Sequence, residues 1–195
     1  MEKKKDTLDA EGKTILEKFV DKSVLNNENI ENILKSFLGK QMQIPPMYSA
    51  IKVDGKKLYE YARQGIEVKV EPRNIEIYNI KLLNINIENT EIEFEVSCSK
   101  GTYIRVLCED IAEKLNTVGY MSSLKRTLVD KFGVQNAIDF ETLEENKNNI
   151  HKTMLPQNRN FCNVYNKPAN GKFSKFALTC IQVVRIGKLT YIPAL

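Results

Sequence analysis

The most regular alternation of apolar and polar positions lies at residues 91–98, where every second side chain is apolar. The apolar positions are Ile92, Phe94, Val96 and Cys98. A period of two predicts a β-strand with one buried face. After a polar turn at residues 99–102, apolar side chains recur at spacings of three and four, which predicts an amphipathic helix over residues 104–115. The pattern thus predicts a strand that leads through a short turn into a helix.

The residues before this strand predict two helices joined by an extended segment and a turn. Apolar positions between residues 27 and 38 share one helical face, and Gly39 would end that helix. Two consecutive prolines exclude a helix at residues 43–52, which should be extended and strand-like. Residues 53–55 should turn the chain into a short helix at residues 56–64.

Further strands and helices complete the expected fold. Residues 66–70 and 75–87 alternate in polarity and predict two or three more strands. Consecutive strands with short polar connections favour a largely antiparallel sheet with flanking helices, an α+β fold. Downstream, the pattern predicts helices at residues 121–128 and 140–146, the second capped by Asp139.

The composition changes after Glu145. The remaining residues hold eight lysines and arginines and no Asp or Glu, although the net charge of the whole chain is only +4. Residues 147–160 are rich in Asn and Lys and lack periodicity, which predicts a linker between a domain at residues 1–146 and a small β-rich unit at residues 161–195. Within that unit, strands at residues 183–186 and 189–192 would form a hairpin. The basic unit favours an anionic partner, nucleic acid rather than membrane, unless it is simply a solvated tail.

Cysteine and histidine usage argues against metal chemistry. The four cysteines have no CxxC spacing, and the chain has a single histidine. We therefore expect no metal site, and cysteines that act as small buried apolar side chains of a reducing compartment. No apolar run reaches the roughly 18 residues that span a bilayer, and no signal segment follows Met1. These features predict a cytoplasmic protein without a membrane partner.

Lys100, Tyr103 and Arg105 lie where the central strand passes into the helix. Thr102 is a candidate N-cap there, and the first helical turn offers free N–H groups to an anion. Arginine can grip a carboxylate or a phosphate through two parallel hydrogen bonds. The residues alone leave open whether Arg105 does so or only pairs with a surface acid.

Aromatic and basic side chains alternate in residues 43–65, a mixture suited to RNA. They are Tyr48, Lys52, Lys56, Lys57, Tyr59 and Arg63. Any one of them alone is more often an ordinary surface residue.

Four motifs together resemble a known family. They are DTLDAEG at residues 6–12, QIPPMYSAIKVDGKKLYEYARQG at residues 43–65, SKGTYIRVLCEDI at residues 99–111, and the LKR and FG pair at residues 124–133. Their order and spacing resemble those of bacterial tRNA pseudouridine synthases of the TruB family over residues 6–145. The C-terminal stretch resembles at most a shortened PUA-like RNA-binding domain.

The resemblance implies isomerisation of a uridine in the T-loop of tRNA, without cofactor or metal, on a base flipped out of its loop. Arg105 matches the arginine that orients the catalytic aspartate, Tyr103 lies beside the flipped base, and Leu124 matches an apolar residue of the uracil pocket. The residues expected to contact RNA or to support RNA-binding loops are Tyr48, Lys52, Arg63, Lys100, Lys125 and Arg126.

The chain departs from the family at its N-terminus. The resemblance places the nucleophilic aspartate in a G-x-x-D-x-x-A-x-G segment upstream of the turn at residues 6–12, and the chain contains no such segment. We therefore expect a synthase shortened at its N-terminus, inactive alone and otherwise monomeric. Two alternatives remain: a tRNA-binding module without chemistry, and one half of a split synthase completed by another polypeptide. In each case Arg105 would lack its catalytic carboxylate partner within the chain.

Overall fold

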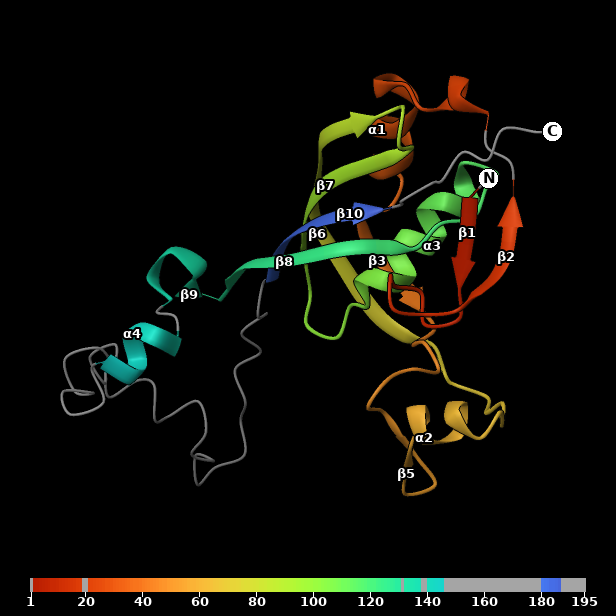
Figure 1. Ribbon diagram of the computed structural model, residues 1–195, viewed down its shortest axis with the longest axis vertical. Helices are drawn as coiled ribbons and strands as arrows, with labels where there is room; N and C mark the ends of the chain where they lie inside the picture. Colours follow the sequence, from red (N-terminus) through yellow and green to blue (C-terminus); the bar gives the residue numbers. More distant parts are fainter. Residues whose placement is uncertain (1, 19–20, 131, 138–139, 146–179, 187–195) are drawn as a thin grey trace.

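A six-stranded sheet forms the body of the protein, with the strand order β3-β6-β7-β10-β8-β9 (Figure 1). The computed structural model describes residues 2–18, 21–130, 132–137, 140–145 and 180–186. The strands are β3 (Gly39–Gln43), β6 (Arg73–Asn86), β7 (Glu91–Cys98), β8 (Met121–Val129), β9 (Phe132–Gly133) and β10 (Cys180–Ile186). Neighbouring strands in this sheet are antiparallel, which confirms the predicted α+β fold with a largely antiparallel sheet.

Two helices, α1 (Asn27–Lys35) and α3 (Ile104–Lys114), cover one face of the sheet and enclose the core. The inward side chains predicted for β7 are all buried, with exposed fractions of 0–3%. They join Leu34 of α1 and Leu107 of α3 in one cluster. Full burial of such a side chain stabilises the fold by about 1.5–3 kcal/mol, so the alternation along β7 decides which face of the sheet becomes the core.

Local signals begin and end these helices. Asn26 caps α1, because its side chain accepts a hydrogen bond of 2.9 Å from the backbone N–H of Asn29. The chain leaves α1 at Ser36 and reverses at Gly39, whose φ of +94° lies in the left-handed region that glycine adopts without strain. The predicted helix at residues 27–38 is therefore present but ends three residues early.

Two smaller substructures flank the sheet. A hairpin of β1 (Glu2–Lys5) and β2 (Thr14–Lys18) lies beside α3, where Lys4 forms an ion pair with Glu109. A lobe formed by β4 (Lys52–Val53), β5 (Lys56–Lys57) and α2 (Leu58–Arg63) projects away from the sheet (Figure 1). Short helical segments at η1 (Lys22–Val24), η2 (Val134–Asn136) and α4 (Phe140–Glu145) complete the described elements.

The helix predicted at residues 121–128 is wrong, because these residues form strand β8. The apolar spacing of Leu124 and Leu128 suits a helix, but β8 pairs with β10 from Met121 to Val129. Ladder hydrogen bonds with a strand far along the chain outweigh this weak local preference.

The predicted strand segments before β7 differ in extent from the structure. Residues 75–87 belong to one strand of 14 residues, β6, whose pairing with β7 shifts register twice. Residues 66–72 form neither helix nor strand, so the strand predicted at residues 66–70 is wrong. The extended segment predicted at residues 43–52 is a strand only at its first and last residues, because proline cannot donate to a ladder.

The C-terminal part contributes one described element. Strand β10 comes from the region expected to form a separate β-rich unit, and it lies inside the main sheet between β7 and β8. The second strand of the predicted hairpin, the linker at residues 147–160 and the expected cap Asp139 lie outside the described residues. In the described part of the chain, no helix is long and apolar enough to cross a membrane.

Candidate active site

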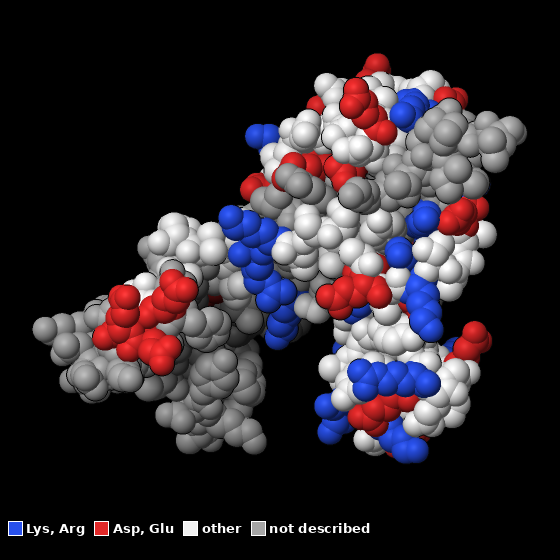
Figure 2. All heavy atoms as spheres, viewed as in Figure 1, with Lys and Arg blue, Asp and Glu red and all other residues white. Residues whose placement is uncertain are grey.

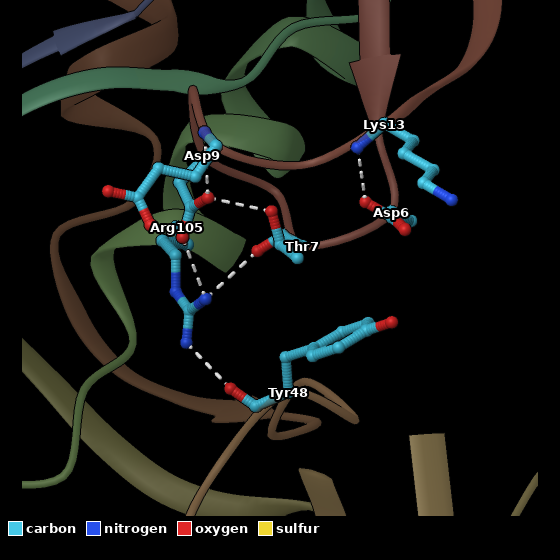
Figure 3. Close-up of polar contacts among 7 residues, drawn as sticks. Asp6, Thr7, Asp9, Lys13, Tyr48 and Arg105 are labelled. Atoms are coloured by element: carbon cyan, nitrogen blue, oxygen red, sulfur yellow. Dashed lines mark hydrogen bonds and ion pairs between the residues drawn. The ribbon is translucent and has the colours of Figure 1, made fainter. Parts of the chain in front are cut away.

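Arg105 lies in the first turn of α3 and joins three segments of the chain (Figure 3). Its Nη1 donates hydrogen bonds to the carbonyl oxygen of Thr7 at 3.0 Å and to Oδ2 of Asp9 at 2.9 Å. Its Nη2 donates to the carbonyl oxygen of Tyr48 at 2.8 Å. The side chains of Arg105 and Asp9 are 22% and 25% exposed, so the pair is largely shielded from water.

Asp9 is held by the turn between β1 and β2. Its Oδ1 accepts hydrogen bonds from Oγ1 of Thr7 at 2.6 Å and from the backbone N–H of Glu11 at 3.3 Å. Across the same turn, Oδ1 of Asp6 accepts from the backbone N–H of Lys13 at 2.7 Å (Figure 3). Both aspartates of the DTLDAEG segment therefore shape the turn through side-chain to backbone hydrogen bonds.

Close packing in this turn requires glycine at position 12. A β-carbon on Gly12 would lie 2.9 Å from the backbone nitrogen of Thr7 and closer still to the side chains of Thr7 and Asp6. The turn is tied to the sheet where β8 begins, since the N–H of Met121 donates to the carbonyl oxygen of Leu8 at 3.0 Å. Asp9 is thereby fixed relative to α3.

Gln43 positions the start of α3. Its Nε2 donates to the carbonyl oxygen of Tyr103 at 3.1 Å, and its Oε1 accepts from the backbone N–H of Tyr103 at 2.8 Å. Tyr103 itself occupies the N-cap position without a side-chain cap. The predicted N-cap at Thr102 is wrong, because Oγ1 of Thr102 donates to the carbonyl oxygen of Ser99 within the preceding turn.

The lobe around α2 carries the aromatic and basic residues noted in the sequence. Asp54 and Gly55, with φ of +50° and +83°, form the predicted turn between β4 and β5. The ring of Tyr59 lies 5.4 Å from Nζ of Lys57 and 5.2 Å from the guanidinium carbon of Arg63. Figure 2 shows several cationic side chains on this lobe, with acidic side chains beside them.

The predicted site residues fall into three groups. The first is formed by Arg105 and Tyr48, which meet through the carbonyl of Tyr48, with Tyr103 adjoining through Gln43. Lys52 and Arg63 belong to the α2 lobe. The remaining predicted residues are exposed, on the turn after β7 or on β8: Lys100, Leu124, Lys125 and Arg126.

The sequence interpretation missed two residues, Asp9 and Gln43. Asp9 pairs with Arg105, so the arginine has one carboxylate partner within the chain. The expectation that the catalytic carboxylate is absent from the chain concerns a different group and stays a prediction. The spacing of the two aspartates in DTLDAEG was the one feature of the sequence that could have indicated Asp9 as a site residue. Gln43 had no local signal, since its partner lies 60 residues away.

The guanidinium of Arg105 retains donors for a second anion. The three hydrogen bonds to described residues use three of the five N–H donors that arginine carries. The remaining two, on Nε and Nη2, can bind one carboxylate in the two-pronged geometry that arginine favours. Beyond its bonds to Thr7, Asp9 and Tyr48, Arg105 thus carries two further N–H donors.

A second group of acids lies along α3. Burial and the neighbouring carboxylates of Glu109 and Glu113 raise the pKa of Asp110 to about 6, with Lys114 acting in the opposite direction. Burial, with a smaller contribution from Asp110, raises the pKa of the Cys108 thiol. Among the described residues, no three His, Cys, Asp or Glu side chains form a group that could hold a metal ion.

Two family profiles match the chain. The TruB family pseudouridylate synthase N-terminal domain matches residues 1–104, and the tRNA pseudouridylate synthase B C-terminal domain matches residues 105–159. The tRNA pseudouridine synthase B of Clostridium tetani is 46% identical over 77% of this chain and 50% of its own length. The same enzyme of Oceanobacillus iheyensis is 44% identical over 77% of this chain and 49% of its own length. The chain thus spans about half the length of these curated relatives.

Proposed function

Since the chain belongs to the TruB family of pseudouridylate synthases, we propose that it forms the arginine-bearing part of an enzyme that converts uridine to pseudouridine in the T-stem-loop of tRNA. The reaction breaks the bond between C1′ of the ribose and N1 of the base and forms a bond between C1′ and C5. A proton leaves C5 and N1 gains one, so reactant and product have the same atoms. A tRNA substrate also implies a cytoplasmic location.

The placement of Arg105 carries this proposal. Thr7, Asp9 and Tyr48 fix its guanidinium on one side, and two N–H donors remain on the other. In the proposed enzyme these donors hold the nucleophilic aspartate in its ionised form, oriented toward C1′ or C6 of the nucleotide. Asp9 offsets part of the charge of Arg105, so that the arginine is stable when the second carboxylate is absent.

The nucleophile is the part that this chain does not supply. None of its nine glycines is followed three residues later by an aspartate, so the G-x-x-D-x-x-A-x-G segment expected from the resemblance is absent from the sequence. In the proposed enzyme this segment completes the active site. Leu124 and Tyr103 would then line the uracil pocket, beside the Arg105 side of the active site.

The cations of the α2 lobe and of β8 supply the proposed RNA contacts. Three charged groups of the lobe lie within 6 Å of a tyrosine ring centroid, those of Lys56, Lys57 and Arg63. Cations that bind phosphates and rings that stack on bases are therefore close together. Lys125 and Arg126 are exposed on β8, and Lys100 is exposed on the turn before α3. Such groups neutralise phosphates and position the nucleic acid.

A tritium-release assay tests the proposed activity. T-stem-loop RNA labelled at C5 of uridine is mixed with this chain and with the segment of the Clostridium tetani relative that precedes its own D-T-x-D-A-x-G turn. We expect tritium release by the mixture and none by either part alone. Arg105→Lys should abolish tritium release, because a single ammonium group cannot replace the several N–H donors of the guanidinium group. Arg73→Lys, at an exposed position of β6, is the control and should not change tritium release. Release by this chain alone, or no release by the mixture, would contradict the proposal.

A second candidate function is RNA binding without catalysis. The exposed cations of the α2 lobe are the observation that favours it. This function predicts tRNA affinity in the chain alone and no tritium release in any mixture. A filter-binding titration of tRNA with this chain at low salt tests the second candidate function. If the chain does not bind tRNA, it is not a tRNA-binding module.

A further inference from the structure

Two of the four cysteines lie directly opposite each other in the sheet. β7 ends at Cys98 and β10 begins at Cys180, and these two residues form the terminal pair of the antiparallel ladder between the two strands (Figure 1). On its other side β10 pairs with β8, where Cys180 lies opposite Val129. The backbone of Cys180 is therefore placed between two strands, at the position that faces Cys98.

The register fixes the separation of these two residues. Residues directly opposite each other in an antiparallel pair share one face of the sheet, and their Cα atoms lie about 4.5–5.5 Å apart. A disulfide needs Cα atoms about 4.4–6.8 Å apart. The backbone at positions 98 and 180 thus meets the distance requirement of a disulfide without movement of either strand.

Cys108 does not share this arrangement. It lies on α3, in the helical layer that packs on the sheet, although it belongs to the same core cluster as Cys98. Burial raises the pKa of the Cys108 thiol, so little of the reactive thiolate forms there. Among the cysteines of the described residues, only Cys98 and Cys180 are strand partners.

The place of the pair at the end of the ladder decides how an oxidant reaches it. The side chain of Cys98 is 1% exposed, so a reagent in solution does not contact it while the ladder is closed. Strand ends open more readily than strand centres, and opening of the terminal pair leaves the other pairs between β7 and β10 in place. Oxidation therefore requires local opening and not unfolding of the sheet.

We propose that Cys98 and Cys180 form a redox-responsive pair, which a small-molecule disulfide converts from two thiols into an intramolecular disulfide. One cysteine attacks the small disulfide as its thiolate, forms a mixed disulfide and releases one small thiolate. The second cysteine attacks the protein sulfur of the mixed disulfide, closes the bond between the strands and releases the second small thiolate. The two protons of the cysteines pass to the released thiolates, and two electrons pass from the cysteines to the small disulfide. Formation of this bond does not depend on pseudouridine synthesis.

The bond would fasten the C-terminal strand to the strand that leads into the candidate active site. Ser99 is already held on β6, since its N–H donates to the carbonyl oxygen of Glu76 at 2.8 Å and its Oγ accepts from the N–H of Glu76 at 2.9 Å. The disulfide adds a covalent link on the side of β10 and closes a loop of about 80 residues. In a reducing compartment the pair remains two thiols, and the bond forms when an oxidant prevails.

Peptide mapping identifies the bond, because trypsin places each cysteine in a different peptide. Cleavage after Lys and Arg, except before Pro, gives residues 82–100, 106–114, 160–172 and 176–185 with one cysteine each. The full chain is equilibrated with oxidised and reduced glutathione, alkylated and digested. We expect the peptides 82–100 and 176–185 to be linked, and dithiothreitol to separate them. Alkylated or glutathione-bound Cys98 and Cys180 at the most oxidising ratio would overturn the proposal, as would a bond from Cys98 to another cysteine.

The same oxidation in urea is the control for the folded register. In the unfolded chain, pairing follows sequence separation, so Cys98 should bond to Cys108 more often than to Cys180. An identical pattern of bonds in the folded and unfolded chains would contradict a role of the strand register.

Thermal unfolding of two matched variants supplies the second measurement. Cys108→Ala with Cys162→Ala keeps the proposed pair, whereas Cys98→Ala with Cys162→Ala removes one of its members. Oxidation should raise the Tm of the first variant by about 5 °C or more, because it closes a long loop, and should leave the Tm of the second unchanged. Equal shifts in both variants, or no shift in the first, would overturn the proposal. If either variant does not fold, the peptide map of the unaltered chain decides.

Discussion

At the scale of single residues, Arg105 joins segments that lie far apart in the sequence. The hydrogen bonds to Thr7 and Asp9 span 98 and 96 residues, and the bond to Tyr48 spans 57. Because the pair with Asp9 is largely shielded, removal of either partner leaves a charge with little solvation, and the penalty is larger than for a surface pair. The pair therefore stabilises the site geometry as well as preparing it for a second carboxylate.

A double-mutant cycle measures this interaction. We expect Arg105→Met and Asp9→Asn to show a coupling free energy of about 1–2 kcal/mol in urea denaturation. The exposed pair of Lys35 and Glu31, with side chains 61% and 48% exposed, provides the control. Its cycle of Lys35→Met and Glu31→Gln should give less than about 0.5 kcal/mol. Similar coupling in both cycles would show that shielding of the Arg105 pair is not what strengthens it.

Asp110 predicts a pH dependence of stability. Its pKa in the folded chain is about 6, against an ordinary value of 3.8, so the folded state binds more protons than the unfolded state between these two values. The contribution of Asp110 to stability is therefore present below about pH 4 and is lost as the pH rises through about 6.

Asp110→Asn should accordingly raise the free energy of unfolding near pH 7 by about 1 kcal/mol, a figure that allows for solvent screening at this half-buried position. The difference from the unaltered chain should shrink toward zero near pH 4. Urea denaturation at the two pH values makes the measurement, and an effect of equal size at both would contradict burial of the carboxylate as its cause.

At the scale of elements, the start of α3 depends on a residue of another strand. Gln43, at the end of β3, is 5% exposed and bonds both the N–H and the carbonyl of Tyr103. The N-cap residue of α3, which makes no side-chain cap hydrogen bond, is thus anchored to the sheet. This contact also sets the position of Arg105 two residues later.

Gln43→Met tests this contact. The new side chain has similar length but no hydrogen-bonding amide, so the N–H of Tyr103 loses its partner, while the carbonyl of Tyr103 keeps the hydrogen bond from the N–H of Leu107. We expect a loss of about 1–2 kcal/mol in unfolding free energy. Gln64→Met at the exposed end of α2 is the matched control and should change stability by less than about 0.5 kcal/mol. If both variants unfold at the same urea concentration, Gln43 does not stabilise the start of α3.

At the scale of the whole molecule, the α2 lobe and the sheet present separate groups of cations. Figure 2 shows basic side chains on the projecting lobe and in a band over the sheet. The lobe keeps its cations near tyrosine rings, with Lys57 and Arg63 against Tyr59.

Salt dependence measures the contribution of the lobe. The double change of Lys57→Gln and Arg63→Gln should weaken binding of T-stem-loop RNA and reduce the slope of log affinity against log salt by about two, one for each lost phosphate contact. Lys22→Gln with Lys35→Gln, exposed near α1, is the charge-matched control and should leave the slope unchanged. The reverse result would place the RNA on the α1 side of the molecule.

The features that depend on local pattern could be predicted from the amino-acid sequence. Alternation fixed β7 and its buried face, because burial of every second side chain is favourable wherever the strand lies in the sheet. The changed spacing fixed α3, and Gly39 and the Asp54-Gly55 pair fixed reversals that need positive φ. Family motifs indicated Arg105 as a site residue before any geometry was known.

Contacts between distant groups could be seen only in the folded chain. Residues far apart in the sequence meet in the pairing of Arg105 with Asp9, the bonds from Gln43 to Tyr103, the strand conformation of β8 and the place of β10. Such contacts produce no periodic pattern in the sequence. Their free energies in the shielded interior exceed the weak secondary-structure propensity of a single segment. For that reason the sequence could indicate Arg105 as a site residue, while the partner that fixes it and the strand position beside it emerged only from the fold.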